Sequence, residues 1–298
     1  MLELLLLLYG LSEQNKAEIS NLNDIHLRDP FILPVPEEKM YYLFGTGWSL
    51  PDGPGFMVYR SKDLKTWKGP SVAFQYYEGF WSNKEYWAPE VHKYKDKYYM
   101  FASFNADGKS RGTQILVSEN PQGAYKPLTE KPVTPENWEC LDGTLFVDEN
   151  QKPWIVFCHE WTQIIDGTIA ALPLSDDLTK SIDEPLTLFK ASDAGWVVGI
   201  GKEGNGKVTD GPFLYRLSHG SLAMLWSSFG KTGYCQTVAI SRSGSLTGPW
   251  EHPENTICSE NGGHGMLFHT FDNHLKLILH KPNSGAPPIP TIFDVEIK

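Results

Sequence analysis

The feature of this sequence that most constrains its fold is a fivefold internal repeat. Each repeat opens with a short motif that combines Gly or Pro with a polar residue. The five motifs are Arg28-Asp29-Pro30-Phe31, Trp87-Ala88-Pro89-Glu90-Val91, Leu141-Asp142-Gly143-Thr144-Leu145, Thr209-Asp210-Gly211-Pro212-Phe213 and Gly262-Gly263-His264-Gly265-Met266. The polar residues at 29, 90, 142, 210 and 264 are separated by 61, 52, 68 and 54 residues. A period of about 50–60 residues suits one four-stranded blade of a β-propeller.

The segments after each motif favour strands, because they are short, apolar and aromatic, and are bounded by Gly, Pro, Asn and Asp. The first of them in each repeat are Tyr41–Phe44, Tyr98–Phe101, Trp154–Phe157, Ala223–Trp226 and Leu275–Leu279. We therefore predict an all-β, five-bladed β-propeller, with residues 19–298 as a single domain. The last repeat lacks an outer strand, so we expect residues 19–22 to close the ring there. A β-sandwich is the alternative, but it leaves the recurring polar motif unexplained.

Composition excludes some functions. The 298 residues contain 26 Lys and Arg against 36 Asp and Glu, a formal net charge of −10. An acidic chain without a basic block is a poor binder of nucleic acid or of anionic membranes. The ten Trp residues exceed what a core of this size needs, and flat indole rings are typical of surfaces on which sugars stack.

The N-terminus begins with an apolar run, residues 4–9, that is far too short to span a bilayer. It resembles the apolar centre of a secretory signal without its basic start. We interpret residues 1–18 as a truncated signal and predict a secreted or periplasmic protein, with a short terminal helix as the alternative. Four widely spaced cysteines, Cys140, Cys158, Cys235 and Cys258, form no CxxC pair. Free thiols are expected, and a disulfide is the alternative.

Propeller geometry gives the repeated motifs a chemical consequence. The first strand of each blade is innermost and begins at one end of the central channel, so the motifs converge there. The ring then contains Asp29, Glu90, Asp142, Asp210 and His264. Crowded carboxylates shift one another's pKa values, as general acid and base catalysts require.

The five motifs, in this order, resemble those of family 43 glycoside hydrolases over nearly the whole chain from residue 22. The resemblance implies a five-bladed propeller and an inverting glycosidase that acts mainly on arabinose- or xylose-containing plant polysaccharides. It also implies that Asp29 is the general base that activates water and that Asp142 tunes and orients the acid. No cofactor is required by this chemistry, and a monomer that acts on carbohydrate is expected.

The sequence departs from the family pattern at the general acid. The family has a Glu at the start of the fourth blade, where this chain has Asp210, and the missing methylene shortens the reach by roughly 1.5 Å. Either Asp210 is the acid, or Glu160 has taken over that role. Because strand two of a blade returns to the height at which strand one begins, Glu160 is expected near Asp142. The sequence favours Glu160 narrowly and leaves Asp210 as a tuning residue or the alternative acid.

The same argument predicts which residues surround the substrate. They are Trp48, Trp87, Glu90, Trp161, Trp226, His264 and His280. His264 is also the candidate for holding an axial ion through water, and related propellers often carry calcium in the channel.

The substrate is left open by the motifs. An exo-acting α-L-arabinofuranosidase is the first choice, because segments 70–86 and 192–207 are placed to close one end of the site. A β-xylosidase, an endo-1,4-β-xylanase or arabinanase, and an exo-galactanase are the alternatives. Two other possibilities are a related propeller family acting on fructans or mannosides, and a non-catalytic carbohydrate-binding propeller that has lost its acid.

Overall fold

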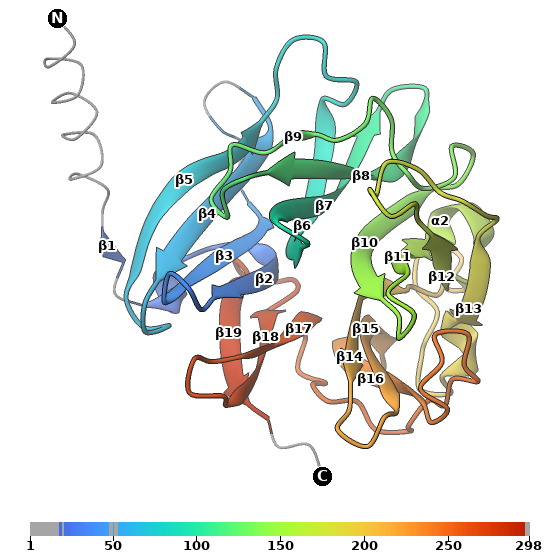
Figure 1. Ribbon diagram of the computed structural model, residues 1–298. Helices are drawn as coiled ribbons and strands as arrows, with labels where there is room; N and C mark the ends of the chain where they lie inside the picture. Colours follow the sequence, from blue (N-terminus) through green and yellow to red (C-terminus); the bar gives the residue numbers. More distant parts are fainter. Residues whose placement is uncertain (1–17, 20, 48–49, 51–52, 296–298) are drawn as a thin grey trace, which may run out of the picture.

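Five antiparallel sheets surround a central axis and form the predicted five-bladed β-propeller (Figure 1). The structure is a computed structural model that describes residues 18–19, 21–47, 50 and 53–295. The chain passes once around the ring, so that the last blade, drawn in red, lies beside the first, drawn in blue. Within each blade the strands follow one another outward from the axis, except that the first strand of the chain lies at the outer edge of the first blade.

The blades differ in their outer strands. Blade 1 has five strands: β2 (Arg28–Val35), β3 (Met40–Thr46), β4 (Gly55–Ser61), β5 (Trp67–Gln75) and, outermost, β1 (Glu18–Ile19). Blade 2 has four: β6 (Lys84–Tyr94), β7 (Lys97–Ala106), β8 (Lys109–Ser118) and β9 (Lys126–Pro127). Blade 3 has four: β10 (Cys140–Val147), β11 (Pro153–His159), β12 (Thr168–Pro173) and β13 (Leu186–Lys190). Blade 4 has β14 (Asp210–Arg216), β15 (Leu222–Gly230) and β16 (Gly233–Ser241), and blade 5 has β17 (Gly263–His269), β18 (Leu275–Lys281) and β19 (Ile289–Asp294). The short helices are η1 (Leu22–Asp24), α2 (Trp161–Ile164) and η2 (Ala191–Asp193).

The closing strand was predicted for the wrong blade. Residues 18–19 pair with β5 in blade 1, and blade 5 has only three strands among the described residues. The helix η1 lies against β19, and the ring closes where β17 packs on β2. The hydrophobic core continues across that junction, because Met266, Phe268 and Ile278 of blade 5 belong to the same cluster as the apolar residues of blade 1. Packing of apolar side chains therefore closes the ring where no strand is shared.

Every innermost strand carries a β-bulge near its start, at which two residues oppose one on the neighbouring strand. The first bulge residues are Asp29, Ala88, Asp142, Gly211 and His264, and their φ angles lie between 45° and 56°. Four of the five are not glycine, and a left-handed backbone costs such residues of order 1–3 kcal/mol each. Repeated strain at one level of the channel marks that level as functional.

The bulges correct the alignment of the repeats. Asp29, Asp142 and His264 occupy the equivalent position, but its counterparts in the other blades are Ala88 and Gly211. Asp210 lies one residue before the bulge and Glu90 two residues after its first position. The polar residues of the motifs still meet at the channel, although two of them reach it from neighbouring positions.

Hydrogen bonds from these bulges join each blade to the one before it. At four junctions the N–H of the first bulge residue donates to a side chain at the same register position on strand two of the preceding blade. The pairs, acceptor first, are Thr46 with Ala88 (2.6 Å), Ser103 with Asp142 (2.9 Å), Ser227 with His264 (2.8 Å) and His280 with Asp29 (3.2 Å). Polar side chains next to the channel are therefore part of the framework.

The second bulge residue follows a similar rule. It is proline in three blades, which has no N–H to satisfy. In the other two, Gly143 donates to Thr113 at 3.2 Å and Gly265 donates to Gln236 at 2.6 Å. Both acceptors lie on strand three of the preceding blade. Each N–H of these bulge residues therefore has an acceptor within the protein. These hydrogen bonds hold the inner strands in place.

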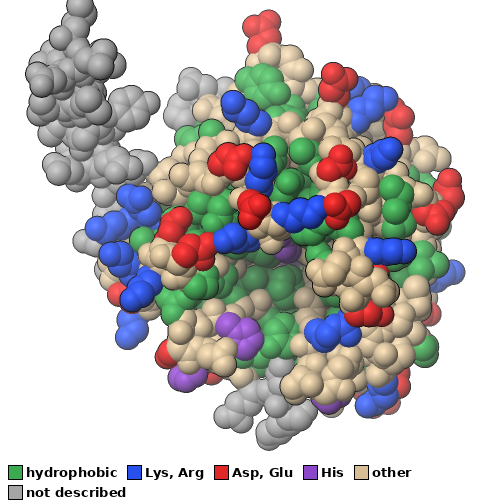
Figure 2. All heavy atoms as spheres, in the orientation of Figure 1, with side chains coloured by type: hydrophobic (Ala, Val, Ile, Leu, Met, Phe, Trp, Pro, Cys, Tyr) green, Lys and Arg blue, Asp and Glu red, His purple; other side chains and the backbone are tan. Residues whose placement is uncertain are grey.

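The outer surface and the far end of the channel have a different character. Lys and Arg alternate with Asp and Glu over the face in Figure 2, and hydrophobic side chains line a hollow near its centre. Beyond the bulges, His92 and Phe213 pack edge to face against Phe31, with ring centroids at 5.1 and 6.3 Å.

Among the described residues no helix is long and apolar enough to cross a membrane.

The predicted sugar-stacking role of Trp226 is contradicted by its burial. Its exposed fraction is 0%, and it packs between blades 3 and 4 against Phe189, Trp196 and His252, with ring centroids at 5.4, 5.6 and 5.9 Å. The sequence argument placed it at the correct height, since it directly precedes Ser227. It failed on direction, because neighbouring residues of a strand face opposite sides of the sheet.

Replacing Trp226 with Ala is expected to lower the free energy of unfolding by about 3–5 kcal/mol, because it empties a buried inter-blade site. Urea unfolding followed by circular dichroism measures this loss. Trp226→Phe, which keeps an aromatic ring in the site, serves as the matched control and should lose less. A loss below about 1 kcal/mol for the Ala variant would contradict the core role.

Candidate active site

The centre of the site is a cluster in which His264 joins two carboxylates from other blades. Its Nδ1 atom lies 3.2 Å from Asp29 Oδ1 and 3.7 Å from Asp142 Oδ2. Burial alone would lower the pKa of His264, but the charges of Asp29, Asp142 and Asp210 raise it above the ordinary value of 6.5. The imidazole is therefore a cation at weakly acidic pH and holds the surrounding carboxylates together.

Asp29 is the carboxylate that stays ionised most easily. Burial opposes its charge, but the positive charges of His264 and Arg28 outweigh burial and hold the pKa of Asp29 below its ordinary value of 3.8. Arg28 is itself fixed by Asn283, with its guanidinium donating to the backbone and side-chain oxygens at 2.9 and 2.6 Å. An ionised carboxylate in this position is suited to accept a proton.

His280 supports Asp29 from behind. Its side chain is fully buried, its Nδ1 accepts the Asp29 N–H, and its Nε2 lies 3.3 Å from Asn283 Oδ1. Burial lowers the pKa of His280 to about 4, so the ring is neutral at physiological pH. The predicted contact of His280 with substrate does not fit its exposed fraction of 0%, whereas positioning of Asp29 does.

Asp142 and Asp210 are the carboxyl groups that hold a proton. Burial raises the pKa of Asp142 to about 7 and that of Asp210 to about 6. Asp142 Oδ2 accepts a hydrogen bond from Gly211 N–H at 3.0 Å, and Asp210 Oδ2 accepts one from the Tyr234 hydroxyl at 2.9 Å. Both groups therefore hold a proton to a higher pH than an ordinary aspartate does.

Gly211 has no room for a side chain. Its φ is +52°, and a Cβ atom there would lie 2.6 Å from Cδ2 of His264. The missing side chain lets the imidazole approach both Asp29 and Asp142.

Glu160 lies on the rim and is paired with Arg111. The Arg111 guanidinium donates to Glu160 and also to Glu85. It lies 4.5 Å from the centroid of the Trp87 ring. Only 9% of the Arg111 side chain is exposed. This ion pair engages the Glu160 carboxylate, which leaves it less available to a departing sugar oxygen.

The other predicted contacts lie around the same end of the channel. Glu90 is buried and pairs with Nε2 of His92 at 3.1 Å. Trp87 is half-buried, with one face under Arg111. Trp161, on α2, packs against Gly206, where a Cβ atom would lie 2.1 Å from its ring. Trp48 lies outside the described residues.

Sequence reasoning missed Arg111 and Tyr234, which contact Glu160 and Asp210. Both lie near the start of the third strand of a blade, in β8 and β16. That strand starts at the same end of the channel at which strand two finishes, so the height argument that identified Glu160 applies equally to these positions.

The predicted ion at His264 finds no direct ligand set. Within residues 18–19, 21–47, 50 and 53–295, no three His, Cys, Asp or Glu side chains are grouped to hold a metal ion. Calcium prefers oxygen ligands, whereas His264 presents a nitrogen that is already paired with Asp29. An ion held through water remains a prediction.

The arrangement combines one ionised carboxylate with a protonated pair in a buried, polar ring. Such separation of pKa values assigns the ionised group as a base and the protonated group as an acid. Inverting glycosidases use this combination, with a water between base and sugar.

Comparison with known proteins identifies the group to which this geometry belongs. The sequence model of the glycosyl hydrolases family 43 matches residues 23–291. The chain belongs to family 43. It is therefore a glycoside hydrolase of an inverting family. This membership argues against the alternative of a non-catalytic carbohydrate-binding propeller.

Two curated relatives of this family 43 chain are named for action on the same linkage. The extracellular exo-α-(1→5)-L-arabinofuranosidase ArbA of Cellvibrio japonicus is 25% identical over 260 residues, 80% of this chain and 70% of the relative. The extracellular endo-α-(1→5)-L-arabinanase 1 of Bacillus subtilis is 26% identical over 251 residues, 80% of this chain and 71% of the relative.

Solved structures extend the likeness. An endo-arabinase from Bacteroides thetaiotaomicron is 43% identical, with a TM-score of 0.89 over 95% of this chain and 99% of that one. A thermostable family 43 glycoside hydrolase shares the fold at 23% identity, with a TM-score of 0.80 over 92% and 90% of the two chains.

The pKa values predict the pH dependence of kcat/KM. Asp29 must be ionised, so activity should persist as pH falls until below 3.8. The Asp142–Asp210 pair must retain its proton, so activity should fall as pH rises through about 6 to 7. A profile that stays flat from about pH 5 to 8 would contradict this assignment.

Replacing the base should remove most of the activity without affecting the fold. Asp29→Asn is expected to lower kcat/KM by about 10²- to 10⁴-fold, because the amide cannot accept the proton of water. Asp294→Asn, at a side chain that is 84% exposed, is the matched control and should keep full activity. Equal activity of the two variants in steady-state assays would remove Asp29 from the base role.

Proposed function

We propose that this protein hydrolyses α-(1→5)-linked L-arabinan with inversion of the anomeric centre. The observation that carries the substrate is the agreement of the relatives, since both curated proteins and the 43% identical structure are named for arabinan-directed activity. The observation that carries the reaction is the ring of Asp29, Asp142 and Asp210 around His264.

The general acid in this proposal is Asp210. Burial raises the pKa of Asp210 to about 6, and the hydrogen bond from Tyr234 orients the carboxyl group. Glu160 is the sequence-based first choice, but its ion pair with Arg111 favours Asp210. Glu160 then has a structural role at the rim, where it binds Arg111, and Arg111 covers one face of Trp87.

The reaction follows from these roles. Asp29 takes a proton from water as the water attacks the anomeric carbon, and Asp210 gives its proton to the departing sugar oxygen. His264 keeps Asp29 ionised, and Asp142, which accepts a hydrogen bond from the N–H that follows Asp210, positions the acid. The acid and base of inverting enzymes are typically about 6.5–9.5 Å apart, which leaves room for the water.

The mode of cleavage has two candidates. Release of single arabinose units is the first, predicted from segments 70–86 and 192–207. The second segment contains a hairpin, residues 199–206, that packs on Trp161 beside Glu160. An exo-acting site needs such a wall at one end, and the Cellvibrio relative is named for exo action.

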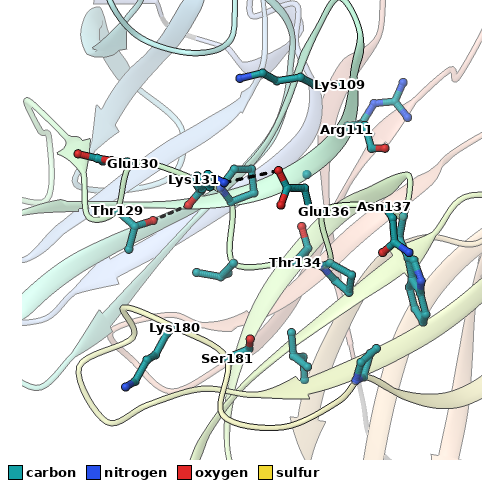
Figure 3. A pocket seen from close by; sticks show the side chains of 18 of the residues that line it. Lys109, Arg111, Thr129, Glu130, Lys131, Thr134, Glu136, Asn137, Lys180 and Ser181 are labelled. Atoms are coloured by element: carbon teal, nitrogen blue, oxygen red, sulfur yellow. Dashed lines mark hydrogen bonds and ion pairs between the residues drawn. The ribbon is translucent and has the colours of Figure 1, made fainter.

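Internal cleavage is the second candidate, and a specific cavity favours it. A cavity of about 970 Å³ lies beside Arg111 and is lined by residues of blades 2 and 3 and of the segment between them (Figure 3). Polar side chains such as Lys109, Thr134, Asn137 and Lys180 line it. A groove that continues from the rim has room for further sugar units, and the 43% identical structure is named an endo-arabinase.

We also propose that the protein is secreted. Both curated relatives are named extracellular. The predicted truncated signal at residues 1–18 lies almost entirely outside the described residues. The four cysteines are free thiols in the structure, so no disulfide is needed for the fold.

Product analysis tests the function and the mode together. Linear α-(1→5)-L-arabinan is incubated with the protein, β-1,4-xylan serves as the control polysaccharide, and products are separated by chromatography. Arabinose alone supports exo action, and a ladder of oligosaccharides supports internal cleavage. Hydrolysis of xylan without hydrolysis of arabinan would overturn the proposed substrate. Proton NMR of the fresh product reports inversion.

Leaving-group dependence tests the acid. Asp210→Asn is expected to lower kcat on an unactivated arabino-oligosaccharide by about 10²- to 10⁴-fold, because the departing oxygen then receives no proton. The loss should be much smaller on the 4-nitrophenyl glycoside of the same sugar, whose leaving group needs no acid.

Glu160→Gln is the matched comparison. It should lose less than about tenfold on both substrates, since it removes a rim charge and not the proton donor. A selective loss on the unactivated substrate in this variant, with Asp210→Asn unaffected, would return the acid role to Glu160.

A further inference from the structure

One blade junction breaks the hydrogen-bonding rule of the other four. At the other junctions an oxygen or ring nitrogen on strand two accepts the N–H of the next bulge. The residue at this register position in blade 3 is Cys158, which pairs with Leu141 immediately before the bulge of β10. A thiol is a weak acceptor, so the bulge N–H of blade 4 is left for another group.

That N–H belongs to Gly211, and it is donated to the carboxylate of Asp142 at 3.0 Å. Asp142 comes from the innermost strand of blade 3, not from strand two. The same kind of donor that elsewhere only joins two blades therefore ends on a carboxylate of the active site.

We propose that Cys158 is a positioning residue, which directs the Gly211 N–H onto Asp142 because it places no oxygen where Thr46, Ser103 and Ser227 place one. This inference rests on the proposed function for its catalytic meaning. The geometry itself rests on the register of the five blades and on the 3.0 Å hydrogen bond.

The hydrogen bond fixes the distance between two catalytic groups. Gly211 N is bonded to the carbonyl carbon of Asp210, so Asp142 Oδ2 is held against the peptide that follows the acid. Movement of Asp142 relative to Asp210 would have to break this contact. The contact is buried, since the exposed fraction of Asp142 is 4% and that of Cys158 is 0%, so water does not readily replace it.

The surroundings of Cys158 favour a packing role over a reactive one. Burial raises the pKa of the Cys158 thiol well above its ordinary value, which keeps it protonated. Its neighbours Ile169 and Leu141 are apolar and buried, and the Thr209 hydroxyl is the polar side-chain partner of the thiol. A serine fits this volume and adds an acceptor in the same register position.

The test is Cys158→Ser, compared with Cys158→Ala and Cys140→Ser. The serine should capture the Gly211 N–H and release Asp142, so kcat on an unactivated arabino-oligosaccharide should fall about tenfold, the size expected for one hydrogen bond to a charged group, with KM little changed. The loss should be small on the 4-nitrophenyl glycoside. Cys158→Ala provides no acceptor and should keep kcat.

Cys140→Ser controls for a hydroxyl at a buried cysteine, because Cys140 is also fully buried but precedes the bulge by two residues. It should keep kcat within about twofold of the parent protein. Equal kcat values for Cys158→Ser and Cys158→Ala on the unactivated substrate would overturn the proposal.

A spectroscopic measurement decides the matter if Cys158→Ser does not fold or if the parent protein proves inactive on arabinosides. In the parent protein the Gly211 amide proton resonance should move upfield on Asp142→Ala, because a hydrogen bond to a carboxylate is lost. The Ala88 amide, held by Thr46, is the internal control. A Gly211 resonance that does not respond more than that of Ala88 would contradict the proposed contact, whatever the substrate.

Discussion

The structure depends on a bulge placed at the same level of all five innermost strands. A bulge turns one residue toward the channel and leaves its N–H without a partner in its own sheet. The neighbouring blade satisfies that N–H, through Thr46, Ser103, Ser227 and His280 at four junctions. The device that joins the blades is thus the one that places Asp29, Asp142 and His264 at the channel. Fold and site share the same hydrogen bonds.

The electrostatics of the site follow from this convergence. One imidazolium, His264, is surrounded by more carboxylates than it can neutralise, so they divide into an ionised group and a protonated pair. Asp29 is ionised because His264 and Arg28 both act on it, and its N–H is fixed by a neutral His280. Asp142 and Asp210 keep a proton because burial opposes a second and third charge. Three residues of one chemical type therefore provide both an ionised and a protonated carboxyl group, as the proposed base and acid require.

Much of this was predictable from the sequence, because the repeat spacing fixes the number of blades and blade geometry brings the five motifs together. What the sequence did not predict depends on local register and direction. Asp210 and Glu90 are displaced from the bulge position by one and two residues. The repeat lengths vary by more than this, so the sequence does not reveal the displacement. Trp226 faces the core because successive residues of a strand point to opposite faces of the sheet, and the next residue, Ser227, faces the channel side. Arg111 comes from the start of a third strand, which lies at the predicted height, but its pairing with Glu160 depends on side-chain positions that the sequence does not specify.

The proposed mechanism requires a division of the carboxyl groups into one base and one protonated pair. Carbon-13 NMR of protein labelled at the aspartate carboxyl carbons, titrated from acidic to neutral pH, measures it directly. Loss of one resonance in each of the variants Asp29→Asn, Asp142→Asn and Asp210→Asn assigns the signals. This division predicts that Asp29 titrates below 3.8, Asp142 at about 7 and Asp210 at about 6. Three independent titrations near the ordinary value of 3.8 would contradict it.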